Sequence, residues 1–434
     1  MQRDTVYVNK ARDAMTANAK PILVIGGGIS GMTAAVEIAE VGYPVILVEK
    51  EAYLGGKVLG FHRYFPKMCP PACGFEINIR RIRQHPKITV YTLAEVKEIT
   101  GTVGAFRASI SVAPRYVTGK IGLDGSMADG LPANRPDDFN LGMTNTRALY
   151  LPNDRCYPPQ YVLDMNALSD DAAAAIRNTC PEGAIDWEMT AREIQVDVGA
   201  IIVATGWRPY DARKLDNLGF GNNGNVITNV MMERLASKNG PTQGVIRRPS
   251  DDKAPANVAF VQCAGSRDDH HLPYCSAVCC MAALKQARYL IEQNGNINIT
   301  LFYIDIRTIG RYEKFYFDLL DRENISFIKG KVAKISHLQS NGDLRLAVED
   351  TLSGQNLYPV FDMVVLSTGV VPNSTLYKRS LNLDCDAYGF IDGESQRDGV
   401  YAVGCAKQPC DVSRATKDAA NAALKAIQCL KKGA

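Results

Sequence analysis

Four cysteines in one short stretch have the residue type and spacing for metal or redox chemistry. Cys263 follows the apolar run VAFVQ, and Cys275, Cys279 and Cys280 come at the expected start of the next helix. Cys275 and Cys279 are four positions apart, so a helical turn would place them on one face. Thiolates from a strand end and a helix start can converge on a [4Fe–4S] cluster, which takes one cysteine on each iron.

Other interpretations of these cysteines stay open at this point. Zinc prefers paired C-x2-C knuckles, whereas Cys279 and Cys280 are adjacent and a long gap precedes Cys275. A vicinal disulfide between the adjacent pair is a redox alternative, and thiols that pack as small apolar side chains are a structural one. His270 and His271 could each replace a cysteine, although their surroundings favour ordinary loop residues.

A glycine-rich turn near the N-terminus indicates a dinucleotide site. Gly26, Gly28 and Gly31 form the pattern G-x-G-x-x-G between a short apolar strand and a helix. The first glycine permits a tight turn, the second lets the backbone approach a pyrophosphate, and the third lets helix and strand pack closely. Glu49 ends the next strand, where a carboxylate can accept hydrogen bonds from a ribose hydroxyl.

The residues around this turn resemble the flavoproteins with two dinucleotide-binding domains, the glutathione-reductase-like class. Their E-x5-GG pattern matches Glu49 and the glycines at 55–56, ATG follows a strand at 204–206, and GVYAVG occupies 399–404. In that class an Asp usually follows the last glycine, and here Cys405 takes its place. The resemblance covers residues 21–434.

This resemblance implies FAD as the cofactor. Lys57 and Lys407 are expected to hydrogen-bond the flavin or tune its potential, and the alternative is that each is a solvated surface lysine. The FAD-binding residues expected from motif and resemblance are Gly26, Gly28, Ile29, Ser30, Gly31, Glu49, Lys50, Gly55, Gly56, Lys57, Thr205, Gly206, Gly404 and Lys407. No catalytic acid, base or nucleophile is assigned.

The second unit departs from that class, whose second domain binds NAD(P)H at a glycine-rich turn. Here the turn reads C-x-G-S-R-D…Y-C-S-x-V-C-C-M…K-Q-A, which resembles the A subunit of heterodisulfide reductases, an iron–sulfur flavoprotein. The resemblance covers essentially the whole chain. The printed sequence lacks the C-terminal ferredoxin region of the methanogen form, so it is closer to the shorter A-like subunits of bacterial sulfur oxidisers. The resemblance to the A subunit implies that a [4Fe–4S] cluster near FAD is held by Cys263, Cys275, Cys279 and Cys280.

A second pair, Cys69 and Cys73, lies farther along the chain than the flavin glycines, in the run CPPAC. Two cysteines cannot hold a cluster alone. We interpret them as an inert loop, with a redox-active pair or a partial metal site near the flavin as the alternative.

The elements that must position these residues alternate between strand and helix, which predicts an α/β fold. Two Rossmann-like domains of the glutathione-reductase type are expected, the second modified to hold an iron–sulfur cluster. The FAD domain is predicted at 1–250 and 360–434, with an irregular excursion at about 115–165, and the second domain at 255–355. Strands are expected at 21–25, 45–48, 194–205, 258–262, 297–306 and 364–368, and helices at 30–42, 276–294 and 411–431.

Composition excludes several classes of function. The formal net charge is +3 and no basic run has interleaved aromatics, so nucleic acid is not an expected partner. No apolar stretch approaches the length of a membrane helix, and the first twenty residues lack the apolar core of a secretory signal. The chain is therefore expected in the cytoplasm. In that reducing compartment, its twelve cysteines favour metal or redox chemistry over structural disulfides.

Three functions fit these observations. The preferred hypothesis is an electron-transfer subunit, dimeric by resemblance, in which FAD exchanges electrons with the cluster. By resemblance its partners are B-like and C-like subunits of a heterodisulfide-reductase-like complex in sulfur oxidation. The alternatives are a stand-alone NAD(P)H-dependent disulfide oxidoreductase, disfavoured by the missing second glycine pattern, and a flavin-stabilised assembly scaffold.

Overall fold

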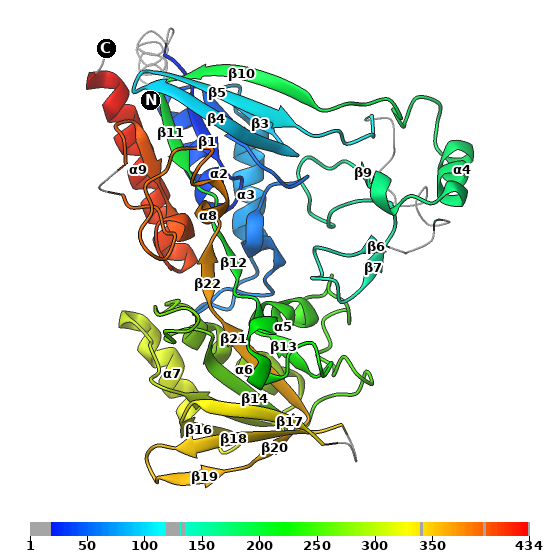
Figure 1. The fold of residues 1–434 in the computed structure, drawn as a ribbon, viewed down its shortest axis with the longest axis vertical. Coiled ribbons are helices and arrows are strands. Elements are labelled where there is room, and N and C mark those ends of the chain that lie inside the picture. The colour runs from blue at the N-terminus through cyan, green and yellow to red at the C-terminus, as the bar shows by residue number, and fades with distance from the viewer. Residues whose placement is uncertain (1–18, 119–130, 132–134, 339–341, 394–395, 433–434) are drawn as a thin grey trace, which may run out of the picture.

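The computed structural model describes residues 19–118, 131, 135–338, 342–393 and 396–432. Residues 1–18 therefore lie outside the described residues, as does the most glycine-rich part of the predicted excursion, at 119–130 and 132–134. Figure 1 shows two layered α/β domains stacked along the long axis of the molecule.

The first domain is built on a five-stranded parallel sheet in the order β23-β11-β1-β2-β3. Helices cover one face of this sheet, and a three-stranded antiparallel sheet in the order β10-β5-β4 covers the other. The parallel strands are β1 (Ile22–Ile25), β2 (Val45–Val48), β3 (Ile88–Tyr91), β11 (Ala200–Val203) and β23 (Val400–Ala402). The covering elements are α2 (Ile29–Val41), α3 (Ala72–Gln84), α9 (Val412–Lys432), β4 (Ala94–Thr102), β5 (Ala105–Val112) and β10 (Arg192–Val198).

Strand β1 is apolar throughout because both of its faces are covered. Ile22 and Val24 pack in the core on the helical side, whereas Leu23 and Ile25 pack in the core beneath the antiparallel sheet. Successive side chains of a strand point to opposite faces, so a strand covered on both sides alternates between two cores. The run ILVI satisfies both.

The second domain repeats this plan with a parallel sheet in the order β13-β21-β14-β15-β16. Helices again cover one face, and the antiparallel strands β17 to β20 cover the other. The sheet strands are β13 (Val226–Thr228), β14 (Asn257–Ala264), β15 (Asn298–Tyr303), β16 (Ile325–Lys329) and β21 (Met363–Thr368). The covering elements are α5 (Asn229–Ala236), α6 (Cys279–Gln293), α7 (Glu313–Leu320), β17 (Val332–His337), β18 (Leu344–Asp350), β19 (Gln355–Leu357) and β20 (Val360–Phe361).

The second sheet extends beyond the predicted range of 255–355. β13 and β21 lie outside that range in sequence, yet β21 pairs with both β13 and β14. Two strands far apart in the chain thus complete the sheet, and the sequence around each carries no local sign of its partner.

Two short strands join the domains where the chain crosses between them. β12 (Trp207–Pro209) leads out of the first domain and β22 (Val370–Pro372) leads back, and the two pair antiparallel with Trp207 opposite Pro372. Both strands lie in the waist between the two bodies in Figure 1.

The predicted excursion forms a separate lobe with a small core of its own, to the side of the first domain (Figure 1). Ser169 caps the helix α4 by accepting a hydrogen bond from the amide of Ala172. The elements here are β6 (Arg135–Pro136), β7 (Asn145–Thr146), β8 (Leu149–Tyr150), β9 (Val162–Leu163) and α4 (Asp170–Thr179). The remaining short helices are α8 (Ser374–Tyr377), η1 (Gly56–Gly60), η2 (Met165–Ala167), η3 (Ala212–Lys214), η4 (Asp216–Leu218), η5 (Gly310–Tyr312) and η6 (Gly404–Ala406).

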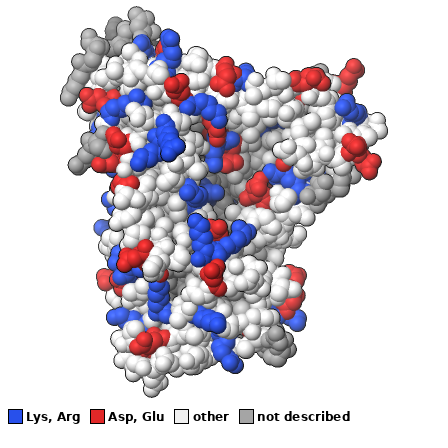
Figure 2. Space-filling view, viewed as in Figure 1, with Lys and Arg blue, Asp and Glu red and all other residues white. Residues whose placement is uncertain are grey.

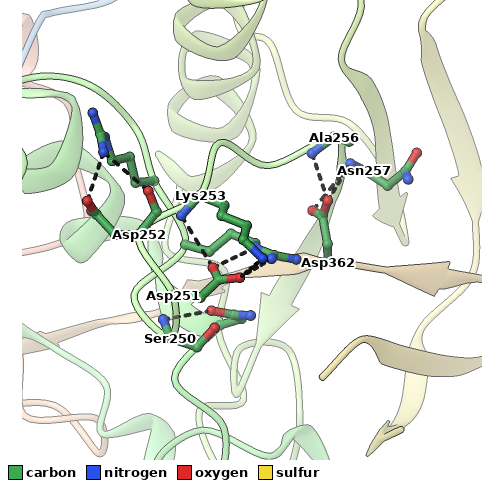
Figure 3. A network of polar contacts seen from close by, with 10 residues as sticks. Ser250, Asp251, Asp252, Lys253, Ala256, Asn257 and Asp362 are labelled. Carbon is green, nitrogen blue, oxygen red and sulfur yellow. Dashed lines mark hydrogen bonds and ion pairs between the residues drawn. The ribbon is translucent and has the colours of Figure 1, made fainter. Parts of the chain in front are cut away.

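The polar segment before β14 is held in place by carboxylates (Figure 3). The Asp362 carboxylate accepts hydrogen bonds from the amides of Ala256 (2.7 Å) and Asn257 (3.2 Å). Asp251 pairs with Arg248, whose Nε lies 3.0 Å from its Oδ1, and with Lys253 at 3.4 Å. These contacts fix where β14 enters the sheet. In the part of the chain that is described, no helix is both long enough and apolar enough to cross a bilayer.

Candidate functional site

Close backbone packing at the turn between β1 and α2 requires glycine. Gly26 has a φ of 107°, and a Cβ added there would lie 2.3 Å from the carbonyl oxygen of Ala204. A Cβ at Gly31 would lie 1.8 Å from the carbonyl oxygen of Gly26. A side chain at either position would push the helix off the sheet edge.

The second glycine of the pattern faces open space. The nearest atom to a Cβ built on Gly28 would be the Gly56 Cα at 3.9 Å. Gly28 is bridged to Gly55, whose amide donates to the Gly27 carbonyl oxygen at 2.9 Å, so the two glycine segments lie side by side. Backbone atoms therefore line this wall, and a ligand can approach them closely. Gly28 is also the N-cap of α2, so the positive end of the helix dipole faces the same opening.

The Glu49 carboxylate lies against this turn at the end of β2. Its oxygens accept hydrogen bonds from the amides of Gly27 (2.6 Å) and Glu51 (2.9 Å), and the side chain is buried. Burial raises the pKa of this carboxyl to about 7, although the two amide hydrogen bonds oppose the shift. Glu49 also lines the adjoining cavity, where a donor hydroxyl would favour the ionised form.

A cavity of about 850 Å³ opens from the glycine turn toward the second domain. Its size lies within the range of 300–1,000 Å³ typical of cofactor sites. Figure 2 shows a hollow on one face with Lys and Arg side chains along its edge. Lys50, Lys57 and Arg234 are among the basic residues that line the cavity, and burial lowers the pKa of the Lys57 ammonium. Glycine backbone and nearby positive charge together suit the pyrophosphate of a dinucleotide.

The cavity gathers most of the residues predicted to bind FAD. Those that line it are Gly26, Gly28, Ile29, Ser30, Glu49, Lys50, Gly56, Lys57, Thr205 and Gly206. The other four lie behind the lining. Gly31 packs α2 against the turn, and Gly55 lies between the side chains of Leu59 and Phe75.

Gly404 and Lys407 also lie behind the cavity wall, where they interact with Asp418 of α9. The Gly404 amide donates to Asp418 Oδ2 at 2.9 Å, and Lys407 Nζ lies 3.4 Å from Asp418 Oδ1. The Lys407 charge is thus already paired with a carboxylate. Cys405, between them in sequence, does line the cavity, as does Cys410.

The second domain contributes a wall that sequence reasoning missed. Glu233 of α5 and Lys285 of α6 both line the cavity and pair at 2.9 Å, with side chains only 3% and 5% exposed. Glu233 also accepts hydrogen bonds from Gln286 Nε2 (2.6 Å) and Tyr289 Oη (3.2 Å). Such a pair gives no local signal, because its members lie on separate helices far apart in sequence.

The four predicted metal-binding cysteines gather where β14 ends and α6 begins. Cys263 lies near the end of β14 with a φ of 55°, a left-handed backbone conformation that is uncommon for a residue with a side chain. Cys279 and Cys280 are the first two residues of α6. Cys275 lies in the preceding loop, so the expected helical i, i+4 relationship with Cys279 is not formed.

The four cysteines lie close enough for charge on one thiol to shift the pKa of another. Burial raises the pKa of Cys263 to about 11, and charge on Cys280 and Cys275 raises it further. Burial also raises the pKa of Cys279, as does charge on the other three cysteines. Arg307 faces Cys275, whose charge raises the pKa of the guanidinium. Thiols with raised pKa values are protonated near neutral pH, so a bound cation would be needed to hold them as thiolates.

Other possible ligands have different partners. His271 Nδ1 lies 2.8 Å from the hydroxyl of Tyr210, and His270 is exposed. Cys69 and Cys73 are both exposed, and Cys69 lines the cavity. Within the described ranges, no three His, Cys, Asp or Glu side chains come close enough to bind a single metal ion.

Helix α6 connects the cysteine site to the cavity. Val278 and Ala282 line the cavity, and Cys279 and Cys280 lie between them in sequence. The first turn of α6 therefore borders both sites.

Comparisons with known proteins agree with this architecture. The family model of FAD-dependent oxidoreductases matches residues 21–63. The crystal structure of thioredoxin reductase from T. acidophilum superposes with a TM-score of 0.52 at 14% identity, covering 94% of this chain and 98% of that one. At that identity the likeness concerns the fold alone.

Two curated relatives align along nearly the whole chain. The A subunit of H(2):CoB-CoM heterodisulfide,ferredoxin reductase from Methanothermobacter marburgensis is 34% identical over 426 residues, 95% of this chain and 64% of the relative. The iron-sulfur A subunit of CoB–CoM heterodisulfide reductase from Methanocaldococcus jannaschii is 35% identical over 422 residues, 93% of this chain and 63% of the relative. The chain thus spans less than two thirds of the length of either relative.

The fold has two Rossmann-like domains, and its glycine turn lies within the residues that match the family model of FAD-dependent oxidoreductases. The 34% identity along 95% of the chain makes it a homologue of the heterodisulfide reductase A subunit.

Proposed function

We propose that this chain is an electron-transfer flavoprotein subunit that binds FAD in the cavity and a [4Fe–4S] cluster at Cys263, Cys275, Cys279 and Cys280. When bound, the flavin supplies two-electron chemistry and the cluster supplies one-electron steps. The observation that carries the proposal is the position of α6, whose first turn bears two of the cysteines and also lines the cavity.

The cavity residues have separate tasks in this proposal. Glu49 accepts hydrogen bonds from the adenosine ribose, and the glycine backbone with the N-terminus of α2 holds the pyrophosphate. Lys57 adds positive charge to the lining, where the half-buried Arg63 is paired with Glu292 at 2.6 Å. Glu233 and Lys285 form an ion pair with no net charge, and this pair closes the side of the cavity toward the second domain.

The cysteine residues have tasks that follow from burial. Cys279 and Cys280 are shielded from solvent, and Cys275 is partly exposed beside Arg307. The ligands of a four-iron cluster surround a group several ångströms across, so they need not converge on one point. The name of the M. jannaschii relative, which describes it as an iron-sulfur protein of the reductase, supports a cluster of this kind.

The wider setting is also proposed. By analogy with the named relatives, the chain works in a heterodisulfide-reductase-like complex with B-like and C-like subunits, as a homodimer, in sulfur metabolism. All twelve cysteines are free thiols, which suits a reducing cytoplasm.

Iron, sulfide and flavin content of anaerobically purified protein test the proposal. We expect bound FAD together with about four irons per chain. The Cys275→Ala variant should lose iron and keep FAD, whereas Cys180→Ala, a half-buried cysteine in the side lobe, should keep both. Flavin without iron in the wild type, or unchanged iron in Cys275→Ala, would overturn the cluster assignment.

The stand-alone alternative makes a different prediction. An NAD(P)H-dependent disulfide oxidoreductase would bleach its flavin on addition of NADH without partner proteins. We expect no rapid bleaching, because the turn after β14 carries cysteines in place of the glycine pattern that holds a nucleotide.

A further inference from the structure

A second pair of cysteines meets at the cavity, far in sequence from the proposed cluster ligands. Cys405 lies in η6, and Cys410 lies just before α9 begins at Val412. Their Sγ atoms are 3.8 Å apart, and both side chains line the cavity. From the geometry we infer that Cys405 and Cys410 form a redox-active dithiol that exchanges two electrons with the flavin. This inference rests on FAD occupying the cavity.

The separation of the two sulfurs suits reversible bond formation. A disulfide has its sulfurs about 2 Å apart, so closure from 3.8 Å requires a small movement of two side chains in a short loop. Cys405 Sγ also lies 3.5 Å from the Cys410 carbonyl oxygen, which keeps the loop folded back on itself. Two thiols held this close can oxidise without unfolding the domain.

Hydrogen bonding makes the two thiols unequal. A hydrogen bond from Cys410 lowers the pKa of Cys405, although burial opposes this shift. The same hydrogen bond, together with burial, raises the pKa of Cys410. Cys405 is therefore the sulfur that ionises first and acts as the nucleophile, and Cys410 holds its proton.

Oxidation of the dithiol by the flavin transfers two electrons and two protons. Two S–H bonds break and one S–S bond forms between Cys405 and Cys410. The two electrons and two protons that leave the thiols are taken up by the oxidised flavin, which becomes the two-electron-reduced form. In the reverse direction the reduced flavin returns them and cleaves the disulfide. A thiol compound that enters the cavity could then exchange with the protein disulfide, and a disulfide compound could exchange with the reduced dithiol.

The surroundings fit a site that keeps these sulfurs available. The lysine between them in sequence is turned to Asp418, and Asp411 accepts a hydrogen bond from Tyr312 at 3.0 Å. Charged neighbours are thus paired with other groups, and the two sulfurs face the cavity.

Peptide mapping tests the dithiol without measuring activity. Trypsin cleaves after Lys407, between the two cysteines, so a disulfide would join peptide 398–407 to peptide 408–414. FAD-loaded protein is equilibrated anaerobically with mixtures of reduced and oxidised dithiothreitol, free thiols are blocked with iodoacetamide, and the digest is analysed without reduction. We expect the joined pair, two hydrogens lighter than the sum of its peptides, under oxidising mixtures.

Three variants test which cysteines form the disulfide. Cys405→Ser and Cys410→Ser should each abolish the joined pair, whereas Cys385→Ser, at a half-buried cysteine outside the cavity, should leave it unchanged. In a second arm, fully reduced protein freed of dithiothreitol receives a flavin-oxidising dye under argon. The joined pair should form in FAD-loaded protein and not in protein stripped of FAD.

The outcomes separate this inference from the proposed function. If FAD is retained but the joined pair never forms in any dithiothreitol mixture, or forms equally with and without FAD in the dye arm, the dithiol inference is wrong and the flavin proposal stands. If the protein does not retain FAD, the flavin proposal fails and the inference fails with it.

Discussion

Glu233 and Lys285 form an ion pair of 2.9 Å that is almost completely withdrawn from solvent, at a cavity wall that faces the FAD-binding domain. Lys285 also donates to the carbonyl oxygen of Arg63 at 2.7 Å, and Glu233 accepts from the amide of His62 at 3.0 Å. The pair therefore anchors the segment after η1 to the second domain. Burial of two opposite charges is tolerated here because each has further hydrogen-bond partners.

Removing one member of this pair should be costly. We expect Lys285→Met to lower the free energy of unfolding by about 3–5 kcal/mol, because the Glu233 carboxylate is left buried without its countercharge. The double variant Glu233→Gln with Lys285→Met should recover a large part of that loss. Urea unfolding followed by far-ultraviolet circular dichroism measures both. Equal losses for the single and double variants would show that the ion pair itself is not responsible.

The affinity for FAD should rise with pH through Glu49. In the FAD-free protein the pKa of this carboxyl is about 7, so it is largely protonated at pH 5.5 and ionised at pH 8. A ribose hydroxyl donates to the ionised form, and each unit by which FAD lowers the pKa strengthens binding tenfold. We expect FAD to bind about tenfold more tightly at pH 8 than at pH 5.5. Quenching of flavin fluorescence measures this, and Glu49→Gln should bind more weakly with no such pH dependence.

The same group should affect folding stability in the FAD-free protein with the opposite trend. The folded pKa lies above the unfolded value of 4.5, so the folded state binds the proton more tightly. The stabilisation is complete below pH 4.5 and is lost as the pH rises to 7. A shift of this size corresponds to about 3 kcal/mol. Urea unfolding at pH 5 and pH 7.5 should show the loss in the wild type and not in Glu49→Gln.

Two glycine-to-alanine variants should behave in opposite ways. Gly31→Ala places a methyl group 1.8 Å from the Gly26 carbonyl oxygen, so α2 must shift and FAD binding should be lost. Gly74 lies in α3 with no atom within 4 Å of an added Cβ, and Gly74→Ala should stabilise the helix by about 0.5–1 kcal/mol while keeping FAD. Flavin content after gel filtration distinguishes them. Retention of FAD by Gly31→Ala would contradict the packing role of this glycine.

Arg307 should raise the reduction potential of the proposed cluster by a small amount. Its pKa is raised by charge on Cys275, so the guanidinium lies close to a thiolate that would bind iron. Removing a positive charge disfavours the more negative reduced cluster. We expect Arg307→Met to lower the potential by tens of millivolts, a small shift because the side chain is 44% exposed. Redox titration followed by electron paramagnetic resonance measures it, with Arg322→Met, just beyond the end of α7, as the control.

Elements whose signals are local could be predicted from the sequence. β2 lies at Val45–Val48 as expected, and α2 begins at Ile29, one residue before the predicted start. The turn between β1 and α2 was predictable because its glycines are required by contacts within one short βαβ unit. The α/β class with two Rossmann-like domains is confirmed by the two parallel sheets and the thioredoxin reductase likeness.

Features that depend on distant partners could not be predicted. β13 joins the second sheet only through pairing with β21, more than a hundred residues later. The pairing of Glu233 with Lys285 is set by helix packing that no local pattern encodes. Cys275 was expected at the start of a helix because its spacing to Cys279 fits one turn, yet α6 begins only at Cys279.

The connection through β12 and β22 has a mechanical consequence. A single-stranded tether lets two bodies swing and slide freely, whereas a hydrogen-bonded ribbon yields to bending and twisting but resists shear along its length. Trp207 and Pro372 lie opposite each other at one end of this ribbon, and Pro209 and Val370 at the other. The ribbon therefore resists sliding of one body along the other, and the buried contacts of Glu233 and Lys285 with the segment after η1 hold the same two bodies together beside the cavity. Electron tunnelling weakens steeply with distance, so this resistance to sliding would keep the rate of transfer between the proposed flavin and the proposed cluster steady.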